Sequence, residues 1–108
     1  MRKITNQAIK AFIRGKNFKL SNTEVLHFAE MAYMRLHGNL IATARVIDGR
    51  IFDLQISNKG WHTNTTKERL NAFPGVSIAQ RNFNWYLNGK EWNGILVVIN
   101  SDETWEYI

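Results

Sequence analysis

Histidine is the residue type in this sequence best suited to hold a metal ion or to transfer a proton, and it occurs as His27, His37 and His62. No two of them form an H-x-x-x-H or H-E-x-x-H motif, the spacing that puts two ligands on one face of a helix. His27 and His37 can meet across a hairpin, with Glu24 or Glu30 completing a zinc site. The alternative is three ordinary surface histidines, and we expect no metal site.

Nucleophilic and acid–base chemistry has no recognisable motif either. Ser57 and His62 are close in sequence, but residues 58–60 between them are typical of a turn, and no G-x-S-x-G motif is present. Three acidic residues in the body of the chain have no spacing that brings two into one cleft: Asp53, Glu68 and Glu91. The sequence contains no cysteine and no glycine-rich phosphate loop. We predict a protein that is not an enzyme and binds no cofactor.

The basic residues are concentrated at the start of the chain. Residues 1–19 contain six basic and no acidic side chains, whereas the remaining 89 residues contain eight basic and nine acidic ones. The formal net charge of +5 therefore belongs to the first 19 residues. We predict that Lys10 and Arg14 contact an anionic partner, either nucleic acid or an acidic protein. The alternative is that these side chains are only solvated.

Aromatic, amide and basic side chains are interleaved in residues 80–90. Aromatic faces on a strand can stack unpaired bases, and flanking cations can neutralise phosphate. This pattern predicts three partner-binding residues: Arg81, Tyr86 and Lys90. The alternative follows from the two-residue period of a strand, which turns Phe83, Trp85 and Leu87 together into the core and leaves Tyr86 outside.

Two helices are expected, and the second carries a further candidate site. The first spans residues 5–14, with Thr5 as N-cap, Ile4 and Ile9 as a hydrophobic staple and Gly15 after its end. The second spans residues 65–73, where Thr65 and Glu68 fit a capping box.

At the start of the second helix, Lys67 and Arg69 are predicted to face outward or sideways beside Trp61, and this cluster is predicted to bind a phosphate or carboxylate. The alternative is a structural node in which Arg69 bonds strand carbonyls.

The strands are predicted from alternation and turn signals. Residues 25–28, 31–36, 40–47 and 50–57 form a meander, with strong turn signals at Asp48 and Gly49 and weaker ones at Gly38 and Asn39. In the last of these strands Phe52, Leu54 and Ile56 are expected on one buried face. Strands at 76–80 and 83–87 precede the turn residues Asn88 and Gly89, residues 95–99 form a buried strand, and 104–108 form an edge strand or a tail.

These elements predict one α+β domain over residues 1–108, in the order αββββαβββ. An antiparallel sheet, made of a meander and a C-terminal hairpin, is packed by an N-terminal helix and a short second helix. Its parts are a basic helical region (1–19), the meander (20–57), the short helix (65–73), a hairpin and buried strand (76–99) and an acidic tail (100–108). No apolar run is long enough to cross a bilayer and no secretory signal is recognised, so we expect an intracellular protein.

Two segments carry a family resemblance: Thr-Asn-Thr-Thr-Lys-x-Arg-Leu-Asn at 63–71, and Trp-Tyr-Leu-Asn-Gly at 85–89. With residues 1–7 and 36–42, they resemble a family of small bacteriophage and prophage proteins. The resemblance covers the chain to about Gly94, and residues 95–108 depart from it. It implies a viral origin and a location in the bacterial host cytoplasm, and it implies no mechanism.

Size, lack of catalytic motifs and this resemblance predict a non-enzymatic phage accessory protein. It is expected to bind a host protein or complex and to modulate it, for instance as an inhibitor of a bacterial defence system such as an anti-CRISPR. The alternative is a small nucleic-acid-binding module that uses the basic helix and the aromatic strand. Residues 95–99 leave a homo-oligomer open, because an apolar edge strand can pair with a second copy. No membrane partner is expected.

Overall fold

Two helices and ten strands make up the fold in the computed structural model, which describes residues 2–99 and 105–107. The helices are α1 (Lys3–Arg14) and α2 (Asn64–Asn71). The strands are β1 (Phe18–Leu20), β2 (Thr23–Phe28), β3 (Met31–Leu36), β4 (Asn39–Ile47), β5 (Arg50–Ile56), β6 (Ile78–Arg81), β7 (Asn84–Leu87), β8 (Lys90–Glu91), β9 (Val97–Ile99) and β10 (Trp105–Tyr107). The predicted α+β domain with antiparallel strands is confirmed, and β1 and β8 are additions to it.

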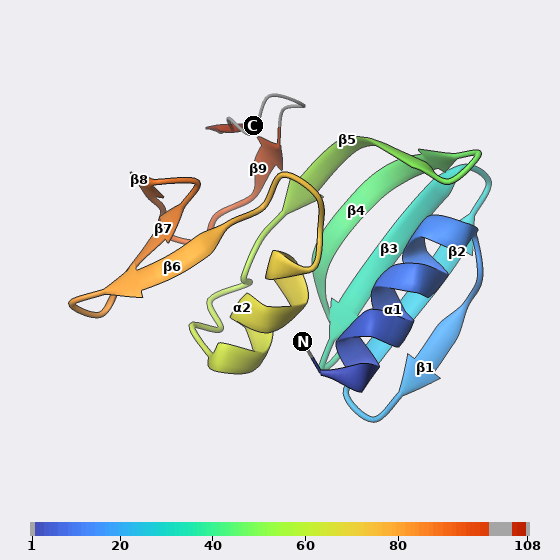
Figure 1. Ribbon diagram of the computed structural model, residues 1–108, viewed down its shortest axis with the longest axis horizontal. Coiled ribbons are helices and arrows are strands. Elements are labelled where there is room, and N and C mark those ends of the chain that lie inside the picture. The colour runs from blue at the N-terminus through green and yellow to red at the C-terminus, as the bar shows by residue number, and fades with distance from the viewer. Residues whose placement is uncertain (1, 100–104, 108) are drawn as a thin grey trace.

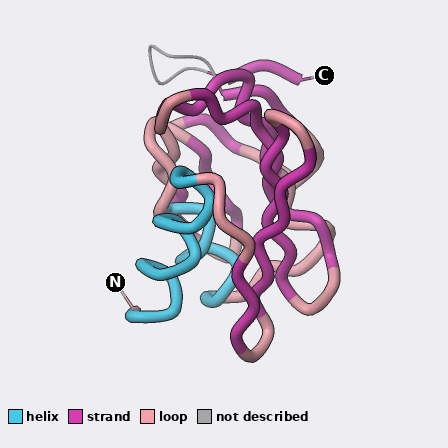
Figure 2. Tube along the Cα trace, turned by 90° about the vertical axis from the view of Figure 1, so that its right-hand side faces the viewer, coloured by secondary structure: helices cyan, strands magenta, loops and turns pink. Residues whose placement is uncertain are grey.

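The strands form two antiparallel sheets (Figure 1). The large sheet has the order β1-β2-β3-β4-β5-β9-β10, and the small sheet has the order β6-β7-β8. The predicted C-terminal hairpin is thus a separate sheet, inserted between β5 and its neighbour β9. Both helices lie on one side of the strands (Figure 2), so the large sheet is covered by helix on one face only.

Local turn chemistry sets the hairpins of the meander. Asp48 and Gly49 have φ of 51° and 76°, as a type I′ turn requires at its two central residues. The β3–β4 turn uses His37 and Gly38 instead of the predicted Gly38 and Asn39, since Asn39 already pairs with Leu36. The meander prediction is confirmed, with that turn moved by one residue.

Helix α1 begins earlier than predicted. It starts at Lys3 with Arg2 as N-cap, so Thr5 lies inside its first turn, and the expected cap and staple at Thr5 are wrong. Thr5 is fully buried, and its hydroxyl is satisfied by hydrogen bonds to side chains from α2. The end is as predicted: Gly15 has φ 72° and donates its N–H to the carbonyl of Ala11.

The core forms where the apolar side of α1 meets the strands. Ala8, Ile9 and Phe12 are buried against β1–β4, and the Phe12 ring meets the edge of Phe73 at 4.9 Å between centroids. Leu70 of α2 is also fully buried. Helix α2 contacts the first turn of α1 through Thr5 and lies beside β6 of the small sheet.

Helix α2 also starts differently from its prediction. Its N-cap is Thr63, whose hydroxyl accepts a 3.2 Å hydrogen bond from the Thr66 N–H. The capping box at Thr65 and Glu68 is therefore wrong. The carboxylate of Glu68 reaches α1 instead and accepts from the backbone N–H of Arg2 at 2.8 Å. A residue of α2 thus caps the start of α1.

Strand β5 does not keep one continuous buried face. The β4–β5 register shifts between Thr43 and Arg45, and Asp53 has φ 55°, which is a bulge. Leu54 and Ile56 are buried as predicted, but Phe52 is 43% exposed. The extra residue at the bulge reverses the alternation, so Phe52 turns to the other face of the sheet.

The apolar run at residues 95–99 is only partly strand. Ile95 and Leu96 are exposed, whereas Val97 and Ile99 are buried in β9. Strand β9 pairs with β5 on one side and β10 on the other, so it is no edge that could pair with a second copy. Of the two alternatives for residues 104–108, the edge strand is confirmed as β10. Asp102 and Glu103 of the predicted acidic tail lie outside the described residues.

Candidate functional site

The predicted partner-binding side chains fall into three regions rather than one surface. Lys10 and Arg14 lie on α1, a second group lies around α2, and a third lies on the small sheet. The second group consists of Trp61, Lys67 and Arg69, and the third of Arg81, Tyr86 and Lys90. Each region has a different environment, so each is described separately.

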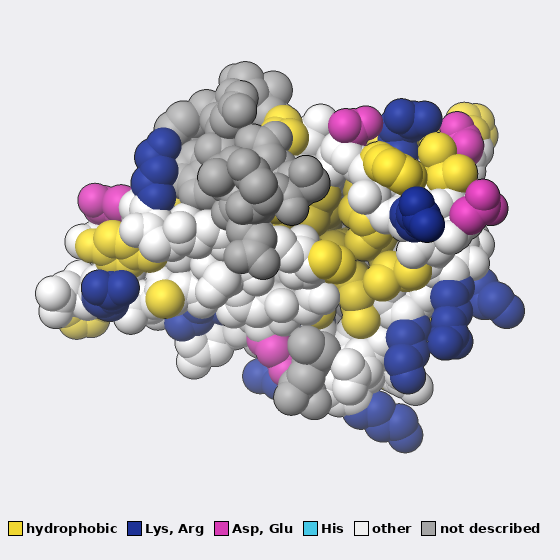
Figure 3. Space-filling model, turned by 45° about the horizontal axis from the view of Figure 1, so that its top comes forward, with side chains coloured by type: hydrophobic (Ala, Val, Ile, Leu, Met, Phe, Trp, Pro, Cys, Tyr) yellow, Lys and Arg dark blue, Asp and Glu magenta, His cyan; other side chains and the backbone are white. Residues whose placement is uncertain are grey.

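The basic region on α1 and β1 is solvent-exposed. All six basic residues between 2 and 19 are exposed, including Lys10 and Arg14. Arg2 lies 3.7 Å from Glu68, and within the described part of the chain the other five form no ion pair. Figure 3 shows Lys and Arg side chains gathered along one edge of the molecule. This geometry leaves Lys10 and Arg14 accessible to an anionic partner.

Arg69 is buried, and the prediction that it faces outward is wrong. Its Nε donates to the hydroxyl of Thr23 at 3.0 Å, and its Nη1 donates to the hydroxyl of Thr5 at 2.6 Å and to Oε1 of Glu68. The alternative of a structural node is confirmed, with two hydroxyls and a carboxylate in place of strand carbonyls. The node joins α1, α2 and β2.

Opposing effects set the charge state of this node. Burial raises the pKa of Glu68, but hydrogen bonds from Thr5 and the Arg2 N–H, and the charges of Arg69 and Arg2, hold that pKa below its usual range. Burial lowers the pKa of Arg69, and Glu68 opposes that change. The pair is ionised at neutral pH and internally satisfied, which makes it a support for the fold.

Lys67 attaches α2 to the small sheet. Its Nζ donates to Oε1 of Gln80 at 3.0 Å and lies 5.9 Å from the centre of the Trp85 ring. One turn later, the side chain of Asn71 donates to the carbonyl of Ile78 and accepts from its N–H, at 3.2 and 2.7 Å. The Asn71 side chain therefore satisfies backbone groups of the edge strand β6 that a neighbouring strand would otherwise bond.

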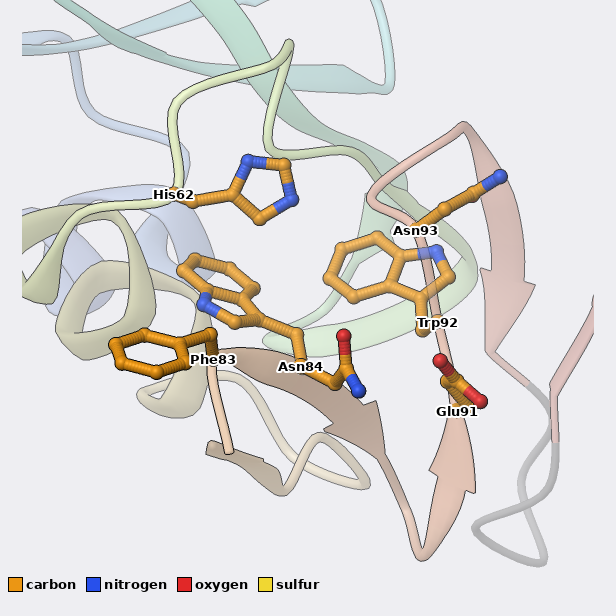
Figure 4. Close-up of a pocket in the computed structure, with 7 residues that line it drawn as sticks. His62, Phe83, Asn84, Glu91, Trp92 and Asn93 are labelled. Atoms are coloured by element: carbon orange, nitrogen blue, oxygen red, sulfur yellow. The ribbon is translucent and has the colours of Figure 1, made fainter. Parts of the chain in front are cut away.

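The small sheet borders a hollow of about 490 Å³ with an aromatic floor (Figure 4). Trp85 and Trp92, each 2% exposed, lie 6.3 Å apart between ring centroids. The edge of His62 meets Trp85 at 5.0 Å. Polar side chains around the opening complete the lining: Asn84, Glu91 and Asn93. Trp92 Nε1 donates to the carbonyl of Ile95, whereas Trp85 Nε1 has no partner among the described residues.

Phe83 at the rim of this hollow is 93% exposed. It occupies the β6–β7 turn with Asn82, and the two residues have φ of 71° and 49°. Trp85 and Leu87 are buried, as the alternation predicted, but Phe83 does not share their face. The missed signal was Asn82, a residue type that favours positive φ in a two-residue turn.

Of the other predicted residues of this region, Arg81 and Tyr86 lie on the face of the sheet opposite Trp85 and Leu87, whereas Lys90 pairs with Leu87. The Arg81 guanidinium lies 5.3 Å from the centre of the Tyr86 ring, and Tyr86 is half-buried. Lys90 is exposed on β8. Trp61, in the loop before α2, is 51% exposed and lies 6.4 Å from the ring of His37.

In the described part of the chain, the residue pairs considered above for catalysis and metal binding do not lie together. Ser57 Oγ donates to the Gly94 carbonyl at 2.9 Å, while His62 faces Trp85. His27 and His37 lie at opposite ends of the β2–β3 pair, so the cross-strand pair considered above does not form. Within residues 2–99 no three His, Cys, Asp or Glu side chains are grouped as metal ligands.

A comparison with known protein families matches residues 1–104 to the Kyanoviridae Gp96 protein family. The chain belongs to that family. The resemblance to small phage proteins is therefore confirmed, and the match continues past Gly94, where the likeness was expected to end. No curated protein and no solved structure matches the chain.

One further property of this Kyanoviridae Gp96 family member concerns membranes. Among the residues that the structure describes, neither helix has the length and apolar character required to cross a bilayer.

Proposed function

We propose that this Kyanoviridae Gp96 family protein is a non-enzymatic phage protein that binds a host protein through the small sheet. The observation that carries the proposal is Phe83, which is 93% exposed at φ 71° on the rim of the aromatic hollow. The contact surface comprises this ring and the hollow beside it.

Phe83 is unfavourable for the isolated protein in two ways. A non-glycine residue in the left-handed region costs roughly 1–2 kcal/mol. An exposed aromatic ring also forgoes roughly 1.5–3 kcal/mol of burial. Strained positions of this kind are concentrated at ligand and partner sites. An aromatic anchor at the tip of a rigid hairpin, with a polar rim and a hollow beside it, matches the anatomy of an interface hot spot.

The finer form of the proposal concerns the host cell. A phage protein that acts on a host protein works in the host cytoplasm, and an inhibitor of a bacterial defence system, such as an anti-CRISPR, is one such protein. Ser57 and His62 interact with different groups, the Gly94 carbonyl and the Trp85 ring, and this arrangement favours binding over catalysis. The identity of the captured protein decides whether it belongs to a defence system.

The experiment is affinity capture from phage-infected host cells with the tagged full chain. We expect the wild type to retain a defined host protein and Phe83→Ala to lose it. Phe28→Ala is the matched control, because Phe28 is 79% exposed at the end of β2, away from the small sheet (Figure 1). The proposal fails if the wild type retains no host protein, or if Phe83→Ala and Phe28→Ala retain it equally.

A second candidate function, nucleic-acid binding, is favoured by the exposed basic side chains of α1 and β1. For duplex DNA, removing one cation that neutralises a phosphate reduces the log–log slope of affinity against salt by about 0.9. Replacing Lys10 and Arg14 together with Ala is expected to weaken binding and to reduce that slope by about 1.8. The control replaces Arg35 and Arg50, which are exposed on other strands. No binding of DNA or RNA at low salt would dispose of this function.

A further inference from the structure

The aromatic hollow beside Phe83 carries a negative charge, the carboxylate of Glu91. Among the described residues that line the hollow, Glu91 is the one Asp, Glu, Lys or Arg side chain. Glu91 is exposed, and it takes part in none of the ion pairs formed by the described residues. The hollow therefore presents a charge that the described part of the protein does not neutralise.

The small sheet holds this carboxylate in place. Glu91 ends β8, where it pairs with Tyr86 of β7, and the next N–H along the chain, that of Trp92, donates to the Trp85 carbonyl at 3.0 Å. Arg81 lies on the same face of the sheet as Glu91, but its guanidinium lies over the Tyr86 ring, 5.3 Å from the ring centre. Since the described residues include no ion pair between Arg81 and Glu91, the carboxylate is positioned by the hairpin and open to another cation.

Hydrogen-bond acceptors and an aromatic face surround the opening of the hollow. Figure 4 shows Phe83, Asn84 and Glu91 on the side formed by the small sheet, with His62 across from them. These four residues are exposed, so a molecule that enters the hollow can reach their side chains. Such a molecule meets a carboxylate, an amide oxygen and an aromatic ring.

The size of the hollow suits a whole side chain of a partner. Its volume of about 490 Å³ falls within the roughly 300–1,000 Å³ of typical ligand pockets. Trp85 and Trp92 close its bottom and are each 2% exposed, so the contacts are made with the rim. A purely apolar group would take the Glu91 carboxylate out of water without a partner, and an anion would be repelled by it. The occupant that fits is a cation that also has apolar surface.

A guanidinium matches this lining better than an ammonium does. It is planar, it has several N–H donors and no acceptor, it binds carboxylates through parallel hydrogen bonds, and it stacks on aromatic rings. An ammonium is a compact and strongly hydrated charge without a flat face to stack. Arginine is also enriched at the hot spots of protein interfaces.

We propose that the hollow binds an arginine side chain of the host protein. The arginine guanidinium pairs with the Glu91 carboxylate, stacks on the Phe83 ring and donates to the amide oxygen of Asn84. This inference rests on the proposed function, since it names the chemistry of the partner that binds the same surface. It also gives the exposed Phe83 ring a planar cation that covers it in the complex.

The test is a ¹H–¹⁵N NMR titration of the full chain with N-acetylarginine N-methylamide at constant ionic strength. We expect the backbone amides of Phe83, Asn84 and Glu91 to shift with saturation at roughly millimolar concentration, as suits a ligand of this size. N-acetylcitrulline N-methylamide has a similar shape without the charge. It is expected to bind at least about tenfold more weakly, since the hydrogen-bond donor is no longer charged.

Two variants complete the titration. Glu91→Gln keeps the size of the side chain and removes its charge, so it is expected to weaken binding of the arginine compound at least about tenfold. Glu30→Gln is the matched control and should bind like the wild type, because Glu30 is exposed in the β2–β3 turn, outside the hollow. The inference is overturned if the arginine compound shifts none of the three resonances, if the citrulline compound binds as tightly, or if Glu91→Gln binds like Glu30→Gln.

Affinity capture with the same variants separates this inference from the proposed function. We expect Glu91→Gln to lose the host protein that the wild type and Glu30→Gln retain. If Phe83→Ala loses the host protein and Glu91→Gln keeps it, the arginine is wrong while the proposed function stands. If the wild type retains no host protein, the proposed function fails, and the titration alone decides whether the hollow binds a guanidinium.

Discussion

The Thr5 hydroxyl donates a 2.6 Å hydrogen bond to Oε1 of Glu68, which joins the first turn of α1 to α2 across 63 residues of sequence. Glu68 also accepts from the N–H of Arg2, and Arg69 donates to the Thr5 hydroxyl at 2.6 Å. Thr5 therefore acts as both donor and acceptor inside the protein. The first turn of α1 is held by α2 rather than by a local cap.

Removing the cation from this node is expected to destabilise the fold. Arg69→Met keeps the length of the side chain but removes the buried guanidinium that donates to Glu68 and to the hydroxyls of Thr5 and Thr23. We expect the free energy of unfolding to fall by about 3 kcal/mol in urea titrations. The control Arg14→Ala, at an exposed position, should change it by less than about 0.5 kcal/mol. Equal losses of stability in the two variants would contradict the role of Arg69 in stabilising the fold.

The charge of Glu68 predicts a dependence of stability on pH. The folded-state pKa of Glu68 lies below its ordinary value, which is about 4.3 in an unfolded chain. Its contribution is therefore complete above about pH 4.3 and is lost as the pH falls through the folded pKa. Glu68→Gln should be less stable than wild type at neutral pH, and the difference should shrink in acid. Urea unfolding of both proteins across this pH range measures the difference in stability. A difference that grows in acid would show that the folded-state pKa of Glu68 is raised rather than lowered.

Gly94 is expected to tolerate no side chain. A Cβ there would overlap the Asn58 amide, and its φ of 91° disfavours other residues. Gly94→Ala should lose roughly 3 kcal/mol or more, from overpacking together with the strained backbone. Gly89→Ala is the matched control, since Gly89 has φ 84° with no atom within 4 Å of the added Cβ, and it should lose about 1 kcal/mol. Thermal unfolding measures the stability of both variants. Similar losses of stability would show that the Asn58 side chain moves aside to accommodate the added Cβ.

Phe83→Gly is expected to raise the stability of the protein and to abolish its binding to the host protein. Glycine adopts the positive φ of this turn without strain, so the variant should gain up to about 1 kcal/mol in the free energy of unfolding. The same variant should lose the host protein in affinity capture. Denaturant titration and capture on one preparation measure both quantities. A variant that is less stable than wild type would mean that the Phe83 ring supports the fold.

Sequence patterns predicted well whatever depends on neighbouring residues. Alternation and the turn residues Asp48 and Gly49 placed the meander, and Asn88 and Gly89 placed the turn after β7, because a two-residue turn with positive φ is a local property. The positions of buried Trp85 and Leu87 followed from the same period.

The errors in the predicted elements arise where a distant group replaced a local interaction. Thr5 and Thr65 have the residue types of helix caps, but Glu68 caps α1 and Thr63 caps α2. Phe52 left the buried face because a bulge at Asp53 changed the phase of the strand. Local sequence patterns, such as the alternation of a strand or the four-residue capping box, specify neither which distant group caps a helix nor where a strand carries a bulge.

The candidate site was only partly accessible from the sequence. Of the residues that the sequence predicts to bind a partner, Trp61, Arg81 and Tyr86 lie wholly or partly at the surface, whereas Arg69 does not. The exposure of Phe83 and the place of Glu91 at the hollow were missed, because each depends on which atoms of other segments fill the space around it.

By itself, the sequence determined the class of fold, the phage family and the concentration of positive charge in residues 1–19. These follow from composition, periodicity and similarity along the chain. Only the tertiary structure decided that Arg69 is internal, that Phe83 stands exposed at a strained turn, and that Glu91 lines the hollow beside it. The physical reason is that burial and hydrogen-bond satisfaction are set by contacts between residues far apart in sequence, such as Thr5 with Glu68 and Asn58 with Gly94.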